Sequence, residues 1–206
     1  MTVFTNARLI DPEMLTDTLG WLRVNNGVIA EMGTGTPPKG EVVDCGGKCL
    51  APGIVDLGVK VSEPGERHKE SFASAGRAAA AGGVTTIVTR PDTLNAIDTP
   101  EVLEFVERRA ATDSIVNVKH MSALTKDRAG TEMVEIGFMK DAGAVAFTDC
   151  DHVIENTKVL QRCMTYARSL GVLVIGHPQE PTLSKGASTT SGKFASLRGL
   201  PAVSPM

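Results

Sequence analysis

Short apolar stretches alternate with helical patterns between residues 54 and 175, and this alternation limits the fold more than any other feature of the sequence. The apolar stretches are residues 54–61, 84–89, 115–121, 144–147 and 172–175, and the helical patterns are residues 71–81, 99–111, 132–142 and 156–170. Glycines mark three of the helix ends, and Thr99-Pro100 is a typical helix start. Such alternation predicts a parallel sheet with right-handed crossovers. Periodicity alone leaves open whether the sheet is open or closed into a barrel.

The first apolar stretch has mostly β-branched residues, so we expect a strand buried on both faces. Gly58, Lys60 and Ser62 lie two residues apart near its end, so their side chains project to the same side. The carboxyl end of a parallel strand is a common place for a reaction site.

Residues 1–50 have a different pattern, which predicts a small all-β domain. Its expected strands are residues 3–4, 8–10, 20–24, 28–32 and 41–44. Asn25-Asn26-Gly27 separates two of them and is a strong hairpin signal, because Asn and Gly tolerate a positive φ.

Composition excludes several classes of protein. The 206 residues carry a net charge of −3, which suggests neither a nucleic-acid nor an acidic-lipid partner. No apolar run approaches the ~20 residues of a membrane span, and the N-terminus lacks the pattern of a signal peptide. The four cysteines form no CxxC pair. We therefore expect a cytoplasmic protein with reduced thiols and no membrane association.

One motif resembles a known family. Pro52–Asp56 and Glu63–Gly65 fit the pattern P-G-[FIL]-[IV]-D-x-H-x-H-x-R-x-P-G of dihydroorotase and its cyclic-amidohydrolase relatives. The resemblance implies that the two metal-binding histidines of that family fall on Gly58 and Lys60. It also implies that the substrate-binding arginine falls on Ser62. The motif therefore keeps its frame, while its metal ligands are replaced.

The resemblance implies a fold, which is α/β: a small N-terminal β-sandwich followed by a (β/α)₈ TIM-type barrel. We assign residues 1–50 to the β domain, 51–180 to a partial barrel with about five of the eight strands, and 181–206 to a loop-rich segment like the family's active-site loop. A closed barrel needs about 250 residues. We expect a fragment of a longer protein or a split gene, with a second polypeptide completing the barrel or with an oligomer formed through the exposed edge.

The other strand ends carry further degenerate family positions. The resemblance places Asp92 where the family has an asparagine that contacts the substrate carboxylate, and Cys150 where it has a metal-bridging carboxylate. A shift by one residue would place Asp149 or Asp151 there instead. His177 is the one retained metal ligand, and a single histidine does not hold a catalytic zinc.

The remaining charged and imidazole groups have structural interpretations. Lys60 either fills the vacated metal position with its own charge or pairs with a carboxylate such as Asp149. We interpret Arg90 and Asp92 as a surface loop pair, and His120 as a hydrogen-bonded structural residue. His68 lies in a charged loop and is expected to be solvated.

Three functional hypotheses follow from the resemblance. The first is a dihydroorotase-like protein of pyrimidine biosynthesis that has lost catalysis, needs no cofactor and assembles with aspartate carbamoyltransferase as a structural or regulatory subunit. The second is an active, zinc-dependent dihydroorotase that interconverts dihydroorotate and N-carbamoyl-aspartate. The third is a mononuclear or metal-free enzyme of new specificity built on Lys60, His177 and Asp149.

Overall fold

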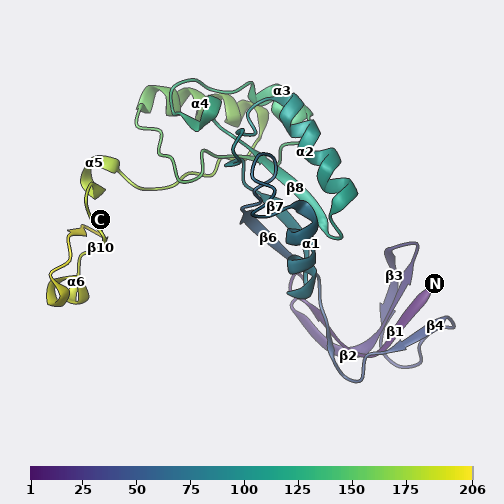
Figure 1. The fold of residues 1–206 in the computed structure, drawn as a ribbon. Coiled ribbons are helices and arrows are strands. Elements are labelled where there is room, and N and C mark those ends of the chain that lie inside the picture. The colour runs from purple at the N-terminus through teal and green to yellow at the C-terminus, as the bar shows by residue number, and fades with distance from the viewer. Residues whose placement is uncertain (206) are drawn as a thin grey trace. The chain divides into compact units, whose positions relative to one another are not determined.

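The computed structural model describes residues 1–205 and divides into two compact units, Met1–Gly53 and Ile54–Met206 (Figure 1). The first unit ends close to the predicted domain boundary at residue 50. Within the described residues, no sheet spans both units, and both clusters of buried hydrophobic residues lie in the second unit, whereas the buried hydrophobic residues of the first are Val3, Ala7 and Trp21. No helix among residues 1–205 is long and apolar enough to cross a membrane.

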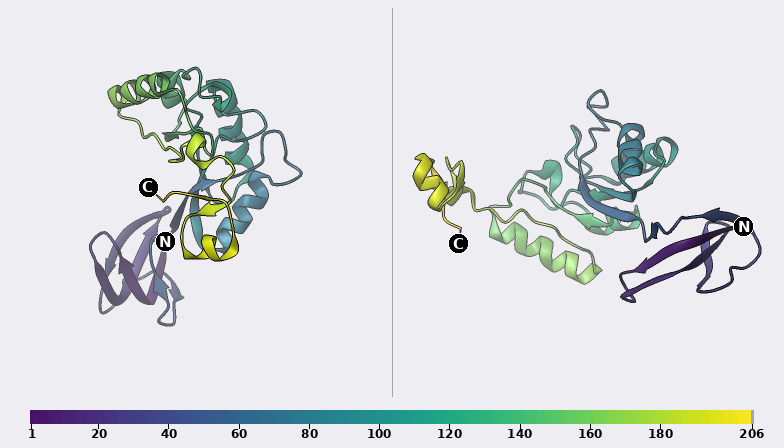
Figure 2. Two further views of the ribbon diagram at one scale, coloured as in Figure 1. Left: turned by 90° about the vertical axis from the view of Figure 1, so that its left-hand side faces the viewer. Right: turned by 90° about the horizontal axis from the view of Figure 1, so that it is seen from below.

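The first unit is a single five-stranded sheet (Figure 2). Its strands are β1 (Thr2–Asp11), β2 (Thr16–Asn25), β3 (Val28–Gly33), β4 (Glu41–Asp44) and β5 (Cys49–Leu50), in the order β3-β2-β1-β4 with β5 beside β1. Asn26 (φ 49°) and Gly27 (φ 76°) form the predicted hairpin turn between β2 and β3. The predicted strands 3–4 and 8–10 are one strand, which an irregularity between Phe4 and Ala7 interrupts. A β-sandwich has two layers, and the structure shows a single sheet in residues 1–53, so the sandwich that the resemblance implies stays a prediction.

The second unit contains the predicted parallel sheet. Its strands are β6 (Ile54–Val59), β7 (Val84–Thr89), β8 (Asn117–Ser122) and β9 (Ala146–Phe147), in sequence order. A parallel bridge from Phe147 to Val174 adds the fifth predicted stretch beside β9. The strands form a curled half-barrel, which confirms the predicted fold class.

Four helices accompany this sheet: α1 (Phe72–Ala81), α2 (Pro100–Asp113), α3 (Ile136–Asp141) and α4 (Thr157–Leu170). Their predicted starts at Ser71 and Asn156 are confirmed as N-caps whose side chains accept backbone N–H groups. The predicted helix at 132–142 was too long at its start. Glu132 instead accepts a hydrogen bond from the Lys126 N–H, and this backbone pairing keeps residues 132–134 extended.

Shorter elements complete the unit. They are the 3₁₀ turn η1 (Lys126–Arg128), α5 (Pro181–Ser184), β10 (Thr189–Thr190), α6 (Lys193–Arg198) and β11 (Ala202–Val203). The last four lie in the segment that the sequence predicts to be loop-rich.

The core of the second unit lies between the strands and α1 to α4. Its fully buried members include Phe72, Ile87, Leu103, Met139 and Phe147. The expectation that the first strand is buried on both faces was wrong. Ile54, Val55 and Leu57 are 56%, 56% and 68% exposed, because β6 is an edge strand with a neighbour on one side only.

Candidate functional site

An open cavity of about 440 Å³ lies at the carboxyl ends of the parallel strands. It is lined by Leu57, Gly58, Arg90, Met121, Thr148, Cys150, Asp151, Ile175, Gly176 and His177. Parallel sheets bind ligands at this end. The cavity brings together three of the predicted site positions, Gly58, Cys150 and His177. Lys60, Ser62 and Asp92 are not among the lining residues.

Gly58 shapes the end of the first strand. Its φ is +86°, and the pairing of β6 with β7 is irregular between Leu57 and Val59. A Cβ atom added at Gly58 would meet no atom within 4 Å, so space is available for a side chain. The backbone is the obstacle, because a side chain in this left-handed conformation costs about 1–2 kcal/mol. A histidine at this position would therefore be strained.

A chain of ion pairs lies beside the cavity. Lys60 Nζ and Arg90 Nη2 each approach Asp92 Oδ2 at 3.0 Å, and Arg90 Nη2 also approaches Asp151 Oδ2 at 2.8 Å. The Asp92 side chain is 4% exposed, whereas that of Lys60 is 60% exposed. Two interpretations from the sequence are corrected here. Lys60 pairs with Asp92 and not with Asp149. Arg90 and Asp92 do pair, as predicted, but the Asp92 side chain is buried and does not lie at the surface.

The ion pairs fix the charge states of the groups around the cavity. Burial alone would lower the pKa of Arg90, but the hydrogen bond to Asp151 and the charge of Asp92 outweigh it and raise that pKa. The same hydrogen bond lowers the pKa of Asp151. Burial, assisted by the negative charge of Asp92, raises the pKa of the Cys150 thiol against the opposing influence of Arg90. Cys150 is therefore a neutral thiol at neutral pH, and metals bind the thiolate.

Asp149 is an internal anchor and does not line the cavity. Its Oδ1 accepts the backbone N–H groups of Leu124 and Thr125 at 2.9 Å each, and its Oδ2 accepts the Thr125 hydroxyl at 2.5 Å. Its partners are therefore in the loop after β8. The combination of Lys60, His177 and Asp149 in the third hypothesis is not assembled in this structure.

The histidines have separate partners. His177 is exposed, and its Nε2 donates to Gln179 Oε1 at 2.8 Å. His120 is 3% exposed; its Nδ1 lies 2.7 Å from Thr89 Oγ1 and its ring contacts Phe72 edge-on, which confirms the structural interpretation. His68 is exposed, as expected of a solvated residue.

The side chains at the strand ends do not fit a catalytic zinc site. Such an ion takes three protein ligands of the His, Cys, Asp or Glu type. No group of three such side chains with the geometry to hold a metal occurs among residues 1–205. At the positions that the resemblance implies, Gly58 has no donor atom and Lys60 is an ion-paired ammonium. Ser62 contributes its backbone carbonyl to a hydrogen bond with the Glu66 N–H.

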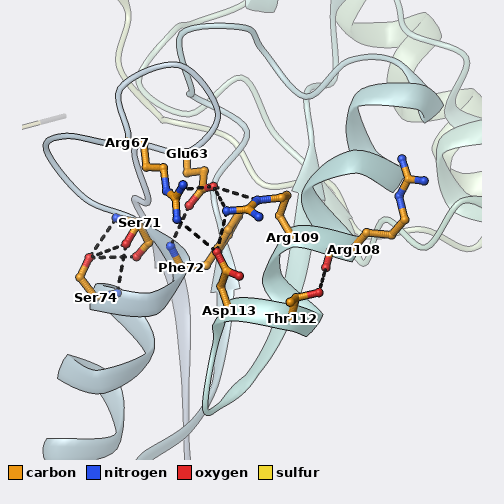
Figure 3. Close-up of polar contacts among 9 residues, drawn as sticks. All are labelled: Glu63, Arg67, Ser71, Phe72, Ser74, Arg108, Arg109, Thr112 and Asp113. Carbon is orange, nitrogen blue, oxygen red and sulfur yellow. Dashed lines mark hydrogen bonds and ion pairs between the residues drawn. The ribbon is translucent and has the colours of Figure 1, made fainter.

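Sequence reasoning missed a second polar cluster, centred on Glu63 (Figure 3). The Glu63 side chain is 5% exposed; its Oε2 accepts the Phe72 N–H at 3.1 Å, and its Oε1 pairs with Arg109 at 3.2 Å and with Arg67 at 3.6 Å. Asp113 pairs with both arginines in turn. The cluster joins the loop after β6 to α1 and α2. Glu63 falls on an unspecified position of the motif, next to Pro64-Gly65, which the pattern specifies, so the motif marks its neighbours and not Glu63 itself.

The fold is shared with solved structures of other proteins. The structure is similar to that of L-hydantoinase from Arthrobacter aurescens, with a TM-score of 0.75 and 22% sequence identity over 88% of this chain and 41% of that one. A crystal structure of a dihydroorotase gives a TM-score of 0.57 at 16% identity, over 87% of this chain and 51% of that one. The chain thus has the fold of a cyclic amidohydrolase.

Sequence comparison narrows this class. A family model described as "Dihydro-orotase-like" matches residues 47–204. The dihydroorotases of Anaplasma phagocytophilum (strain HZ) and Solibacter usitatus (strain Ellin6076) are each 39% identical over 98% of this chain. The chain belongs to the dihydroorotase-like family. It spans about half the length of these relatives, 47% and 48% respectively.

Zinc is present in one structural neighbour. The N-acyl-D-glutamate deacylase from Bordetella bronchiseptica, with a TM-score of 0.59 and 18% identity over 85% of this chain and 44% of that one, is solved with zinc and a phosphonate inhibitor.

Proposed function

We propose that this member of the dihydroorotase-like family does not catalyse the dihydroorotase reaction and has a structural or regulatory role in pyrimidine biosynthesis. One observation carries the proposal. At the position that the motif gives to a metal-binding histidine, Lys60 places an ammonium group 3.0 Å from the buried carboxylate of Asp92. A cationic side chain repels a divalent metal and cannot lower the pKa of a bound water, which is the step that such hydrolases need.

A turnover assay tests this proposal. Dihydroorotate hydrolysis and the reverse ring closure of N-carbamoyl-aspartate are followed with zinc present and with a chelator. The dihydroorotase of Solibacter usitatus is the positive control. We expect no zinc-dependent turnover above the uncatalysed rate. Turnover within a hundredfold of the control would reject the proposal.

The alternative is an active, metal-dependent cyclic amide hydrolase. Its support is His177, the retained ligand position, which lines the cavity together with Asp151. Zinc binding through His177 Nε2 and Asp151 Oδ2 would displace Gln179 and Arg90, which now contact these two atoms. Zinc-dependent turnover in the same assay would select this alternative.

We also propose that the partner is aspartate carbamoyltransferase, as the family resemblance implies, in the cytoplasm. The four cysteines are free thiols, which agrees with a reducing compartment. The surface available for assembly is the pair of open sheet edges, at β6 and at residues 172–175, where Leu57 and Leu173 are 68% and 59% exposed. Unpaired strand edges readily accept further strands.

Native mass measurement tests the partner and the edges together. The protein is measured alone and mixed with the aspartate carbamoyltransferase of the same genome. A mixed species supports the proposed partner. A self-assembled species that persists in the mixture indicates an oligomer formed through the edges and contradicts the proposed partner, and so does a persistent monomer. Leu57→Lys, on the exposed edge strand, is expected to weaken assembly through that edge.

A further inference from the structure

We infer that Lys60, Arg90, Asp92 and Asp151 form an ionic clamp, centred on the buried Asp92, that holds the strand ends together, as a bound metal would do in a catalytic relative. This inference rests on the proposed loss of catalysis. It assigns a function to residues that the motif alone marks only as degenerate.

The clamp connects three strand ends through shared atoms. Lys60 follows β6, Arg90 and Asp92 follow β7, and Asp151 lies beyond β9. Asp92 Oδ2 receives both cations at 3.0 Å, and Arg90 Nη2 contacts both carboxylates, at 3.0 Å and 2.8 Å. The ends of β6, β7 and β9 are therefore tied by side chains of this protein alone, across the end of β8, which contributes no residue to the clamp.

Burial makes Asp92 the centre of the clamp. Its side chain is 4% exposed, so its charge is costly unless it is compensated. Lys60 and Arg90 supply that compensation from two different strands. Asp92 Oδ1 finds no hydrogen-bond partner among residues 1–205, so the stabilisation of this carboxylate falls on Oδ2 and its two cations.

The charges also explain why a cation would not be attracted. Two positive groups, Lys60 and Arg90, face two negative groups, Asp92 and Asp151. The set is neutral as it stands, and a divalent ion would have to displace one of the cations. Lys60 thus supplies at the strand end the positive charge that a bound metal would supply in a catalytic relative.

A double-mutant cycle of Lys60→Met and Asp92→Asn tests the clamp, with urea unfolding of the full chain as the measurement. The helical far-UV circular dichroism signal reports on the second unit, because every helix among residues 1–205 lies there. Lys158→Met is the matched control, since Lys158 is an exposed lysine with no ion pair in the described part of the chain.

We expect Lys60→Met to raise the unfolding equilibrium constant by about threefold to fivefold, as for a partly exposed pair. Asp92→Asn should raise it by about tenfold, which corresponds to 1.4 kcal/mol. The double variant should be at least about threefold more stable than the product of the single effects predicts. Strictly multiplicative effects, or an effect of Lys60→Met no larger than that of Lys158→Met, would overturn the clamp.

A second comparison covers the case in which Asp92→Asn does not fold. Lys60→Arg keeps the charge and should lie within about twofold of the original protein, whereas Lys60→Met should not. Equal stabilities of the two variants would contradict the ionic role.

The effect of zinc chloride on the urea unfolding midpoint provides an independent test of whether the clamp takes the place of a metal. Added in tenfold excess, zinc should leave the unfolding midpoint of the original protein unchanged. A rise in the midpoint would show that the folded protein binds zinc without losing any contact of the clamp. This result would overturn the inference. None of these unfolding experiments measures turnover. The clamp can therefore fail while the protein remains inactive, so the clamp and the proposed loss of catalysis are tested separately.

Discussion

Replacing Glu63 by glutamine should destabilise the second unit, because its carboxylate is buried among two guanidinium groups and a helix N-terminus (Figure 3). Glutamine can keep the hydrogen bond from the Phe72 N–H through its carbonyl oxygen. The variant loses the negative charge opposite Arg109 and Arg67. The loss is therefore electrostatic and changes the side-chain volume little.

The size of the effect follows from burial. Breaking a fully buried ion pair costs about 3–5 kcal/mol. The arginines are 31% and 60% exposed and retain Asp113 as a partner, which reduces the cost. A hydrogen bond to a charged group contributes about 1.5–3 kcal/mol. We therefore expect Glu63→Gln to lower the free energy of unfolding by about 2 kcal/mol.

Urea unfolding followed by far-UV circular dichroism measures this loss. The matched control is Glu66→Gln in the same loop, where Glu66 makes an exposed ion pair with Lys69. An exposed pair is worth less than about 1 kcal/mol. If the two variants lose the same stability, the buried cluster does not hold the loop, and the reasoning is refuted.

Three further predictions concern single residues. Burial lowers the pKa of His120 from 6.5 to about 4, so the unfolded chain takes up the proton first, and the free energy of unfolding falls by about 3 kcal/mol as the pH drops from 6.5 towards 4. His120→Gln should flatten this pH dependence in urea titrations, and an unchanged slope would contradict it. In a thermal unfolding assay, Gly58→Ala should cost about 1–2 kcal/mol because the φ of Gly58 is +86°. Gly176→Ala should be tolerated, because Gly176 has no positive φ and a Cβ atom there would meet no atom within 4 Å. Equal costs of the two substitutions would argue against backbone strain at Gly58. Asp149→Asn should lose about 2 kcal/mol and speed amide exchange at Leu124 and Thr125, and unaltered exchange would show that Asp149 is not their anchor.

Local sequence signals predicted much of the fold. The Asn-Gly turn, the alternation of strands and helices, and the helix starts at Ser71, Thr99 and Asn156 all depend on neighbouring residues, and the structure confirms them. The start of α3 was missed because residues 132–134 pair with the loop after β8, and this long-range contact overrides the helical pattern.

The site was less accessible from the sequence, because its contacts join distant segments. The motif located Gly58 and Lys60, but Lys60 could not be assigned to Asp92 without knowing which loops meet at the strand ends. The Glu63–Arg109 pair, 46 residues apart, was invisible for the same reason. Sequence reasoning therefore identified which donors are missing, and the structure supplied the ion pairs that stand in their place.

The zinc content of the purified protein tests the central claim most directly. The protein is purified from cells grown with added zinc, dialysed against metal-free buffer, and measured for its zinc-to-protein ratio, with the dihydroorotase of Anaplasma phagocytophilum treated in parallel. The account predicts a ratio far below stoichiometric. A ratio at or above one ion per chain, lost on mutation of His177, would contradict it.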